Sequence, residues 1–184
     1  KKAKIKKDKN KRVFYLGYDE SCAQEMEVIE EIKKIPNNKT VFSYLGSFNR
    51  CNDLELIVQA AKALEEDKNF DGYFVLAGFG DLWLPIKEQI KNSKNIIQLG
   101  WLNKGQSSYL MNRTDISLIP SKGLSAPNKL FETLFFGKPI LFCMQGEAKS
   151  ILEKYNAVKY NRGNRFRLAI CFLNLRTYTV VLFG

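Results

Sequence analysis

Residues 119–139 carry the residue types whose chemistry is easiest to assign in this chain, in the order IPSKGLSAPNKLFETLFFGKP. A short apolar run ends at Pro120 and Ser121, a polar loop follows, and a predicted helix carries one acid, Glu132. In open α/β sheets, ligands bind in the crevice outside the carboxyl ends of the strands. A carboxylate on the first turns of a helix at that crevice is well placed to bind vicinal hydroxyl groups, as on a ribose. The segment therefore predicts a domain that binds a nucleotide sugar.

Four more side chains near this crevice carry hydrogen-bonding groups or positive charge. Ser125 and Asn128 could orient sugar hydroxyl groups, or they could cap the helix that begins at residue 128. Arg50 and Lys129 are the basic candidates for phosphate contact, one near each flank of the crevice. The alternative for each cation is a solvated surface side chain, which is the usual place of a lone charge. For Glu132 the alternative is an ordinary helical acid that the helix dipole favours.

Glycine follows three of the predicted strands, at Gly46, at Gly78 with Gly80, and at Gly100. Together with the loop at 120–128, these positions fall on one edge of a parallel sheet. Glycine permits close backbone approach to a ligand, and the N–H groups of the helix N-termini that follow favour a diphosphate. A single glycine of this kind is usually a plain turn, but four loops in register favour an edge that faces a ligand.

The segment GFGD (78–81) matches only the first part of the dinucleotide-binding fingerprint, G-x-G-x-x-G. The third glycine is missing, and the next strand ends in QLG (98–100) without an acid. Because the fingerprint depends on both features, the sequence argues against a nicotinamide or flavin cofactor.

Composition excludes several classes of enzyme. The 184 residues include no histidine, which rules out a Ser-His-Asp triad, a Cys-His pair and a His-ligated zinc within this chain. No apolar run approaches the roughly 18–20 residues that span a bilayer. Four cysteines lie far apart and predict reduced thiols of a cytoplasmic protein, namely Cys22, Cys51, Cys143 and Cys171.

The positive charge is concentrated at one end of the chain. The formal net charge is +10, and residues 1–12, with eight Lys or Arg and one Asp, carry +7 of it. Residues 13–184 therefore carry only +3, which does not favour a nucleic-acid partner. Residues 1–12 predict a solvated tail or linker, with binding to an anionic membrane or nucleic acid as the alternative. The first residue is not Met, so we expect the native protein to extend further upstream.

From residue 40 onward, apolar strands alternate with single helices. Strands are predicted over 40–45, 73–77, 96–99, 115–119 and 139–142, with a weak one at 157–160. Helices are predicted over 53–66, 81–91, 104–113, 128–136 and 147–154. Asp81 is predicted to cap the second of these helices. This spacing implies right-handed βαβ crossovers and a parallel sheet. The solidly apolar strands indicate that both faces are covered. We predict an α/β fold, doubly wound, with a mostly parallel, Rossmann-like sheet.

The two ends fit this alternation less well. Residues 13–35 contain an apolar run followed by an amphipathic helix predicted from Cys22 to Lys34. Residues 161–184 contain no acid and end on an apolar run, which fits either a last helix and strand or a non-native or truncated terminus. We predict a basic tail or linker at 1–12, a nucleotide-sugar-binding domain at 13–160 and a C-terminal segment of open assignment at 161–184.

An ordered set of segments over residues 14–160 resembles the C-terminal, donor-binding domain of family-4 glycosyltransferases, which have the two-domain GT-B fold. The segments are FSYLGSF (42–48), NDLELIVQAAKAL (52–64), YFVLAGFGD (73–81), IIQLGWL (96–102), MNRTDISLIPS (111–121), NKLFETLFFGKPIL (128–141) and GEAKSILEKYNA (146–157). The resemblance implies one half of a GT-B fold. The segment VFYLGYD (13–19) then looks like the link to an N-terminal, acceptor-binding domain that is absent here.

The resemblance also implies roles for the residues of the 119–139 segment. Glu132 matches the second acid of the family's E-x7-E motif, which binds the ribose of the donor nucleotide. The first acid would stand at position 124, where this chain has Leu124. We therefore expect the backbone N–H groups of residues 123–126 to bind the donor hexose. The wording PNKLFE resembles a branch of the family active on surface polysaccharides.

Phosphate-binding Arg and Lys residues follow the first glycine in this family. Here Ser47 follows Gly46, and Arg50 is the nearest base. The residues implied to stabilise the departing diphosphate are Arg50 and Lys129. Trp101 and Leu102 are implied to lie beside the base. The full set implied to bind the nucleotide sugar is Gly46, Gly78, Gly80, Trp101, Leu102, Ser125, Asn128 and Glu132.

The activity that the resemblance implies is retaining transfer of a sugar from a nucleoside diphosphate to a glycan or lipid-linked acceptor, generally without a bound metal or cofactor. We expect a role in surface polysaccharide biosynthesis, in the cytoplasm or at the inner face of the membrane, with no nucleic-acid partner. Leu124 and the poor match at Ser47 leave a non-catalytic nucleotide-sugar-binding module as an alternative. A second alternative is a membrane- or nucleic-acid-binding protein that acts through residues 1–12.

Overall fold

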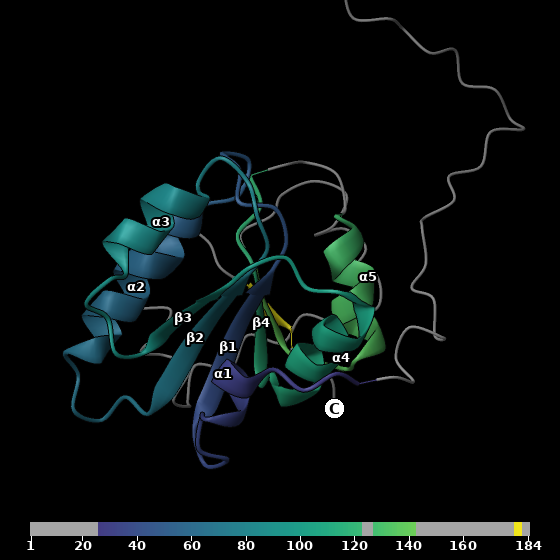
Figure 1. Ribbon diagram of the computed structural model, residues 1–184, viewed down its shortest axis with the longest axis horizontal. Coiled ribbons are helices and arrows are strands. Elements are labelled where there is room, and N and C mark those ends of the chain that lie inside the picture. Colours follow the sequence, from purple (N-terminus) through teal and green to yellow (C-terminus); the bar gives the residue numbers. More distant parts are fainter. Residues whose placement is uncertain (1–25, 123–126, 143–178, 182–184) are drawn as a thin grey trace, which may run out of the picture.

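The computed structural model describes residues 26–122, 127–142 and 179–181, which form one sheet with helices on both faces (Figure 1). The strands are β1 (Thr40–Leu45), β2 (Gly72–Ala77), β3 (Ile96–Leu99), β4 (Ile116–Ile119), β5 (Ile140–Phe142) and β6 (Thr179–Val181). Their order across the sheet is β3-β2-β1-β4-β5-β6. Strands β1 to β5 run parallel, and β6 pairs antiparallel with β5. The predicted mostly parallel, Rossmann-like α/β fold is confirmed.

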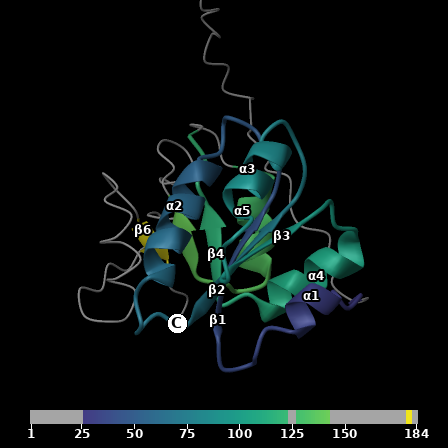
Figure 2. The ribbon, with the colours of Figure 1, turned by 60° about the vertical axis from the view of Figure 1, so that its left-hand side comes forward.

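Five helices of the described residues divide between the two faces of the sheet. They are α1 (Glu30–Lys33), α2 (Leu54–Glu65), α3 (Trp83–Gln89), α4 (Lys104–Arg113) and α5 (Asn128–Phe135). Figures 1 and 2 show α2 and α3 on one face, and α1 beside α4 on the other. In Figure 1, α5 lies with α4. The sheet is therefore doubly wound, as the alternation of strands and helices predicts.

Both faces of the sheet are apolar because successive strand residues point to opposite clusters of core side chains. In β1, Phe42 and Tyr44 belong to the cluster under α2 and α3, whereas Val41 belongs to the cluster under α1 and α4. Leu64 of α2 and Leu110 of α4 are fully buried in these two clusters. Burial of each such side chain contributes roughly 1.5–3 kcal/mol to the stability of the fold. The two packed layers of helices therefore hold the sheet and the loops at its carboxyl edge in place.

The order of the strands reverses at β1, and open α/β sheets bind ligands at the carboxyl ends of the strands on either side of such a reversal. The chain runs outward from β1 to β2 and β3, and then returns to β4, which pairs with the other side of β1. The helices that follow β1 and β4 cover opposite faces (Figure 1). Each loop therefore leads to a helix on a different face, and we call the region at the carboxyl ends of β1 and β4 the crevice, because open α/β sheets bind ligands there.

Two helices begin later than the sequence predicts. Helix α3 begins at Trp83, with Leu82 at the N-cap and no side-chain cap. The N–H of Trp83, which a capping Asp81 would bind, donates to the carbonyl of Gly80 at 2.9 Å. The predicted cap at Asp81 is wrong for that reason. Of the helix predicted over 22–34, residues 26–29 are not helical, and Ile29 has an extended backbone before α1.

Several predictions fall on parts of the chain that the structure does not describe. The helix at 147–154, the strand at 157–160 and the domain boundaries after residues 12 and 160 lie outside the described residues. Within 161–184, the structure describes the short strand β6, which extends the sheet beyond β5.

Candidate functional site

The loops after β1 and β4 are joined by backbone hydrogen bonds at the mouth of the crevice. Asn52 and Ser121 form an isolated antiparallel bridge. The N–H of Asp53 donates to the carbonyl of Pro120 at 2.8 Å, and the Lys122 ammonium lies 3.2 Å from the Asp53 carboxylate. These contacts fix the spacing between the two loops, so side chains from β1, from its loop and from α5 meet at one place.

Lys129, in the first turn of α5, places its ammonium group at this meeting point. Its Nζ donates to Asn52 Oδ1 at 3.2 Å and to the Tyr44 hydroxyl at 3.4 Å. The same Nζ lies 4.4 Å from the centre of the Tyr44 ring, which is within the range of a cation–π interaction. A Cβ at Gly46 would lie only 3.1 Å from this Nζ. The ammonium therefore lies beside the backbone of Gly46, which directly follows β1.

Glu132 lies three residues after Lys129 in α5, a spacing that puts both side chains on neighbouring positions of one helix face. Its side chain is half-buried, and burial raises the pKa of the carboxyl group above its usual value. Within the part of the chain that the structure describes, no hydrogen bond or ion pair reaches this carboxylate. Glu132 is therefore a desolvated acceptor that a bound hydroxyl group would satisfy.

Buried hydroxyl groups connect α5 to the sheet. Thr133, which is buried, donates from Oγ1 to the carbonyl of Lys129 at 2.8 Å and lies 3.1 Å from Ser117 Oγ in β4. The N-cap of α5 is Pro127, with no side-chain cap. Asn128 is the first residue of the helix and is exposed, so the alternative that it caps the helix is wrong. Its contact with a sugar stays a prediction.

The predicted glycines lie together at this edge of the sheet, where they allow two loops to pack backbone to backbone. Gly78 and Gly80 have φ angles of 136° and 152°. A Cβ at Gly78 would fall 1.8 Å from the carbonyl oxygen of Gly46, and one at Gly80 would fall 2.5 Å from that of Phe48. These glycines have a packing role in the described structure, and their contact with a nucleotide sugar stays a prediction.

Trp101 and Leu102, predicted beside the base, have different surroundings. The Trp101 side chain is 76% exposed in the loop after β3, whereas Leu102 packs against the cluster under α1 and α4. In the neighbouring loop Phe79 is 61% exposed, and Gly78 N–H donates to the carbonyl of Gly100 at 3.0 Å, which ties the two loops together. Two large aromatic side chains thus stand exposed at the carboxyl edge of the sheet, in the loops after β2 and β3.

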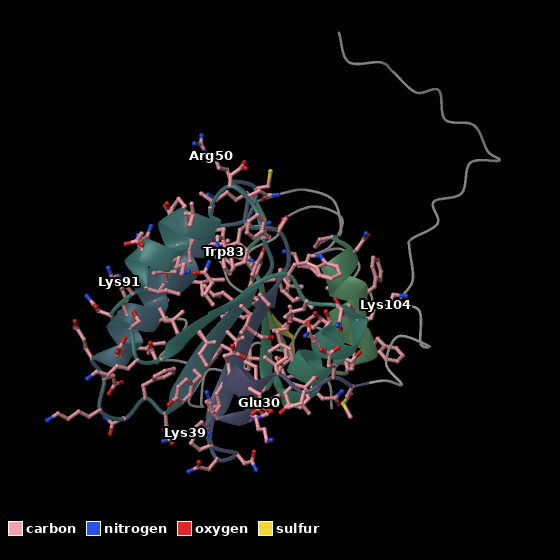
Figure 3. All side chains as sticks on the ribbon, viewed as in Figure 1. Glu30, Lys39, Arg50, Trp83, Lys91 and Lys104 are labelled. Atoms are coloured by element: carbon pink, nitrogen blue, oxygen red, sulfur yellow. The ribbon has the colours of Figure 1, made fainter. Side chains whose placement is uncertain are left out.

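Arg50 is the predicted phosphate contact that the structure does not bring to Lys129. Its side chain is exposed, and Figure 3 shows it pointing outward at the end of the molecule, above α3. Within 26–122, 127–142 and 179–181, no hydrogen bond or ion pair involves its guanidinium group. Arg50 stays a prediction as a phosphate ligand, and binding by it would need its side chain to swing inward.

The sequence does not single out Tyr44 and Asn52, whose side chains hold the Lys129 ammonium. Tyr44 looks like an ordinary apolar residue of the strand TVFSYL, and Asn52 looks like part of a polar loop. A weak signal was present, because Tyr44 is the one ring with a hydroxyl group in that strand, two residues before Gly46. Residues 123–126, which include Leu124 and Ser125, lie outside the described residues.

The described residues offer neither a metal site nor a membrane-spanning helix. They contain no group of three or more Cys, Asp or Glu side chains placed to hold a metal ion. Among the helices of these residues, none is both long enough and apolar enough to cross a bilayer.

A comparison with protein-family models gives a match over residues 39–175 to the model described as glycosyl transferases group 1. No curated protein matches the chain by sequence. The matched residues include β1 to β5, the crevice, Lys129 and Glu132.

Solved structures with a similar fold include three proteins of low sequence identity to this chain. WaaG, a glycosyltransferase involved in lipopolysaccharide biosynthesis, is 16% identical, with a TM-score of 0.59 over 79% of this chain and 41% of its own. HepE of Anabaena, solved with UDP-glucose, is 15% identical, with a TM-score of 0.55 over 79% and 46%. Sucrose-phosphate synthase of Thermosynechococcus elongatus is 13% identical, with a TM-score of 0.60 over 84% and 41%. The chain spans less than half the length of each.

Proposed function

This chain belongs to the glycosyl transferases group 1 family, and we propose that it binds the nucleoside-diphosphate-sugar donor of a GT-B glycosyltransferase. The observation that carries the proposal is that the Lys129 ammonium meets Asn52 and Tyr44 at the carboxyl end of β1, with Glu132 three residues further along α5. A cation suits the diphosphate, and a carboxylate suits the ribose hydroxyl groups. Since HepE was solved with UDP-glucose, its similarity supports a donor of this class.

The proposed reaction breaks the bond between the anomeric carbon of the sugar and the diphosphate, and forms one between that carbon and an acceptor oxygen. Negative charge develops on the departing diphosphate, whose oxygen takes up the proton that the acceptor hydroxyl loses. Lys129 and backbone N–H groups at the crevice would stabilise that charge, which is the task that preorganised donors perform in such sites. We propose that the sugar is transferred with retention of anomeric configuration and without a cofactor. In this proposal Lys129 is the cation that stabilises the negative charge of the departing diphosphate.

The acceptor is proposed to bind outside this chain. The chain spans less than half the length of the similar solved structures, and we propose that a glycan or lipid-linked acceptor binds to a second domain. The similarity to WaaG and the PNKLFE segment support a role in surface polysaccharide synthesis. Exposed Cys51 is a free thiol, which suits a reducing cytoplasmic compartment.

The alternative, a nucleotide-sugar-binding module without catalysis, rests on Leu124 at the position of the first acid and on the outward side chain of Arg50. Both hypotheses require donor binding by Lys129 and Glu132, and they differ in whether the complete protein transfers the sugar. Transfer of labelled sugar by the complete protein supports the enzyme, and tight donor binding without transfer supports the module.

Thermal stabilisation by UDP-, GDP- and dTDP-sugars tests donor binding and identifies the base. We expect one base to raise the Tm of this chain, and Glu132→Gln to reduce that rise, because an amide binds ribose hydroxyl groups less strongly than a carboxylate does. Glu88→Gln is the matched control, since Glu88 is an exposed acid of α3, away from the crevice. Equal stabilisation of the wild type and Glu132→Gln would contradict the ribose role.

A further inference from the structure

The side chains that surround the Lys129 ammonium form a directional network that the proposed function alone does not explain. Lysine has a flexible four-carbon stem, so only some of its rotamers bring Nζ to the crevice. Among the described residues, Asn52 Oδ1 at 3.2 Å and the hydroxyl group and ring of Tyr44 contact the Lys129 ammonium in the rotamer that it adopts. Both contacts come from the β1 side of the crevice, whereas Lys129 comes from α5.

The Asn52 side chain can present only its oxygen to Lys129. Its Nδ2 donates to the carbonyl of Ser47 and to Asn49 Oδ1, both at 3.1 Å. Turning the amide over would place a donor against the ammonium and an oxygen against two acceptors. Asn52 is therefore an acceptor of fixed direction at this point.

Tyr44 is fixed in the same way. Its hydroxyl group donates to the carbonyl of Ser47 at 2.6 Å, so the lone pairs of the oxygen are left to accept from Lys129. Burial raises the pKa of this hydroxyl group, which keeps it protonated and able to donate to Ser47. Ser47 thus receives hydrogen bonds from both residues that hold the ammonium.

Neither residue is accessible to a ligand in the crevice. Tyr44 is fully buried and Asn52 is 7% exposed. These side chains therefore act on a bound diphosphate only indirectly, either through Lys129, which is half-buried, or through the loop that carries Ser47. This burial separates a positioning role from direct binding.

From this geometry we infer that Tyr44 and Asn52 are positioning residues that hold the Lys129 ammonium ready for the donor diphosphate. The inference rests on the proposed function. Gly46 belongs to the same arrangement, because a Cβ there would lie 3.1 Å from both Lys129 Nζ and the Tyr44 hydroxyl oxygen. Preorganisation of this kind raises affinity, because the ligand does not have to order the lysine itself.

Binding of UDP and of uridine, measured by titration calorimetry, tests the inference. UDP is the probe because it is the nucleotide part of the donor in the HepE structure. The ratio of the two affinities isolates the diphosphate, which only UDP carries. We expect Lys129→Met to lower UDP affinity by about 10- to 100-fold, as loss of a charged hydrogen bond does, and to leave uridine affinity unchanged.

Asn52→Ala and Tyr44→Phe should lower UDP affinity by about three- to tenfold in the wild-type background and by less than about twofold in the Lys129→Met background, since coupled residues are not additive. Tyr44→Phe keeps the ring and removes only the hydroxyl group, so a folded protein is expected. Asn95→Ala is the control for a lost buried amide, because Asn95 is buried beside α2 and bonds the carbonyl of Ala61. It should change stability and leave the UDP-to-uridine ratio unchanged.

Losses that are equal in both backgrounds would overturn the inference, because they would show that Tyr44 and Asn52 act independently of Lys129. A nucleotide-free measurement separates this failure from failure of the proposed function. In an ¹H–¹⁵N NMR spectrum recorded at low temperature, the Lys129 ammonium should give a cross-peak protected from exchange in the wild type, and Asn52→Ala should remove it. Absence of that peak in the wild type contradicts the positioning role even if UDP binds. A protected peak without UDP binding contradicts the donor role instead.

Discussion

The two sides of the crevice are built by opposite means. On the β1–β2 side, Gly78 and Gly80 lack side chains, so their loop packs directly on the carbonyl groups of Gly46 and Phe48. On the α5 side, Lys129 and Glu132 bring charge to the edge of the sheet. On the first side, glycines allow two loops to pack closely. On the second side, long side chains supply charge. Substitutions on the first side should affect folding, whereas those on the second should affect binding.

The largest expected effect tests the glycine side. Gly78→Ala should destabilise the protein by more than about 3 kcal/mol, because a strained φ and a steric clash act together. The added Cβ would lie 1.8 Å from the Gly46 carbonyl oxygen. Urea denaturation followed by circular dichroism measures the change.

Gly100→Ala is the matched control for that substitution. Gly100 also ends a strand at the same edge, but a Cβ there would meet nothing within 4 Å. We expect a change of about 1 kcal/mol or less. Equal unfolding midpoints for the two variants would contradict the proposed packing of the loops.

An intermediate effect tests how α5 is held on the sheet. Thr133→Val keeps the shape but removes the hydroxyl group that bonds the Lys129 carbonyl and faces Ser117 Oγ. It should cost about 1–2 kcal/mol, because the buried Ser117 hydroxyl group loses its partner. Adding Ser117→Ala should recover part of that loss in the same denaturation assay. A double variant that costs the sum of two separate losses would show that the hydroxyl groups are not coupled.

The smallest effect concerns the charge of Glu132 in the ligand-free protein. Burial raises the pKa of this carboxyl group above 4.5, so the folded state binds the proton more tightly than the unfolded state does. The stability that Glu132 contributes is full below pH 4.5 and is lost as the pH rises through its pKa in the folded protein. Glu132→Gln should therefore unfold at the same urea concentration as the wild type near pH 4 and at a higher concentration at pH 7. A lower midpoint at pH 7 would mean that the carboxylate has a stabilising partner.

The fold is predictable from the sequence because the signals for it are local. The run TVFSYL, the glycine after it and the amphipathic helix that follows each span a few residues, and they correspond to β1 and α2. The predicted cap at Asp81 failed because a distant loop decides that turn: Leu82 N–H donates to Phe48 O.

Only the local part of the candidate site could be predicted from the sequence, again because local signals can be read along the chain and distant contacts cannot. Lys129 and Glu132 were found from their place in one loop and helix. Tyr44 and Asn52 were missed, because they lie 85 and 77 residues away from Lys129 along the chain. Arg50 was chosen by its position in the loop, but the structure points its side chain outward. Contacts between side chains across the crevice depend on the assembled sheet, and no spacing in the sequence reveals them.

The most direct test of the account is a crystal structure of this chain with UDP-glucose. We expect the diphosphate within hydrogen-bond distance of Lys129 Nζ and the ribose hydroxyl groups on the Glu132 carboxylate, with Asn52 and Tyr44 still holding the ammonium. A nucleotide bound away from the β1–β4 crevice, or one that touches neither Lys129 nor Glu132, would contradict it.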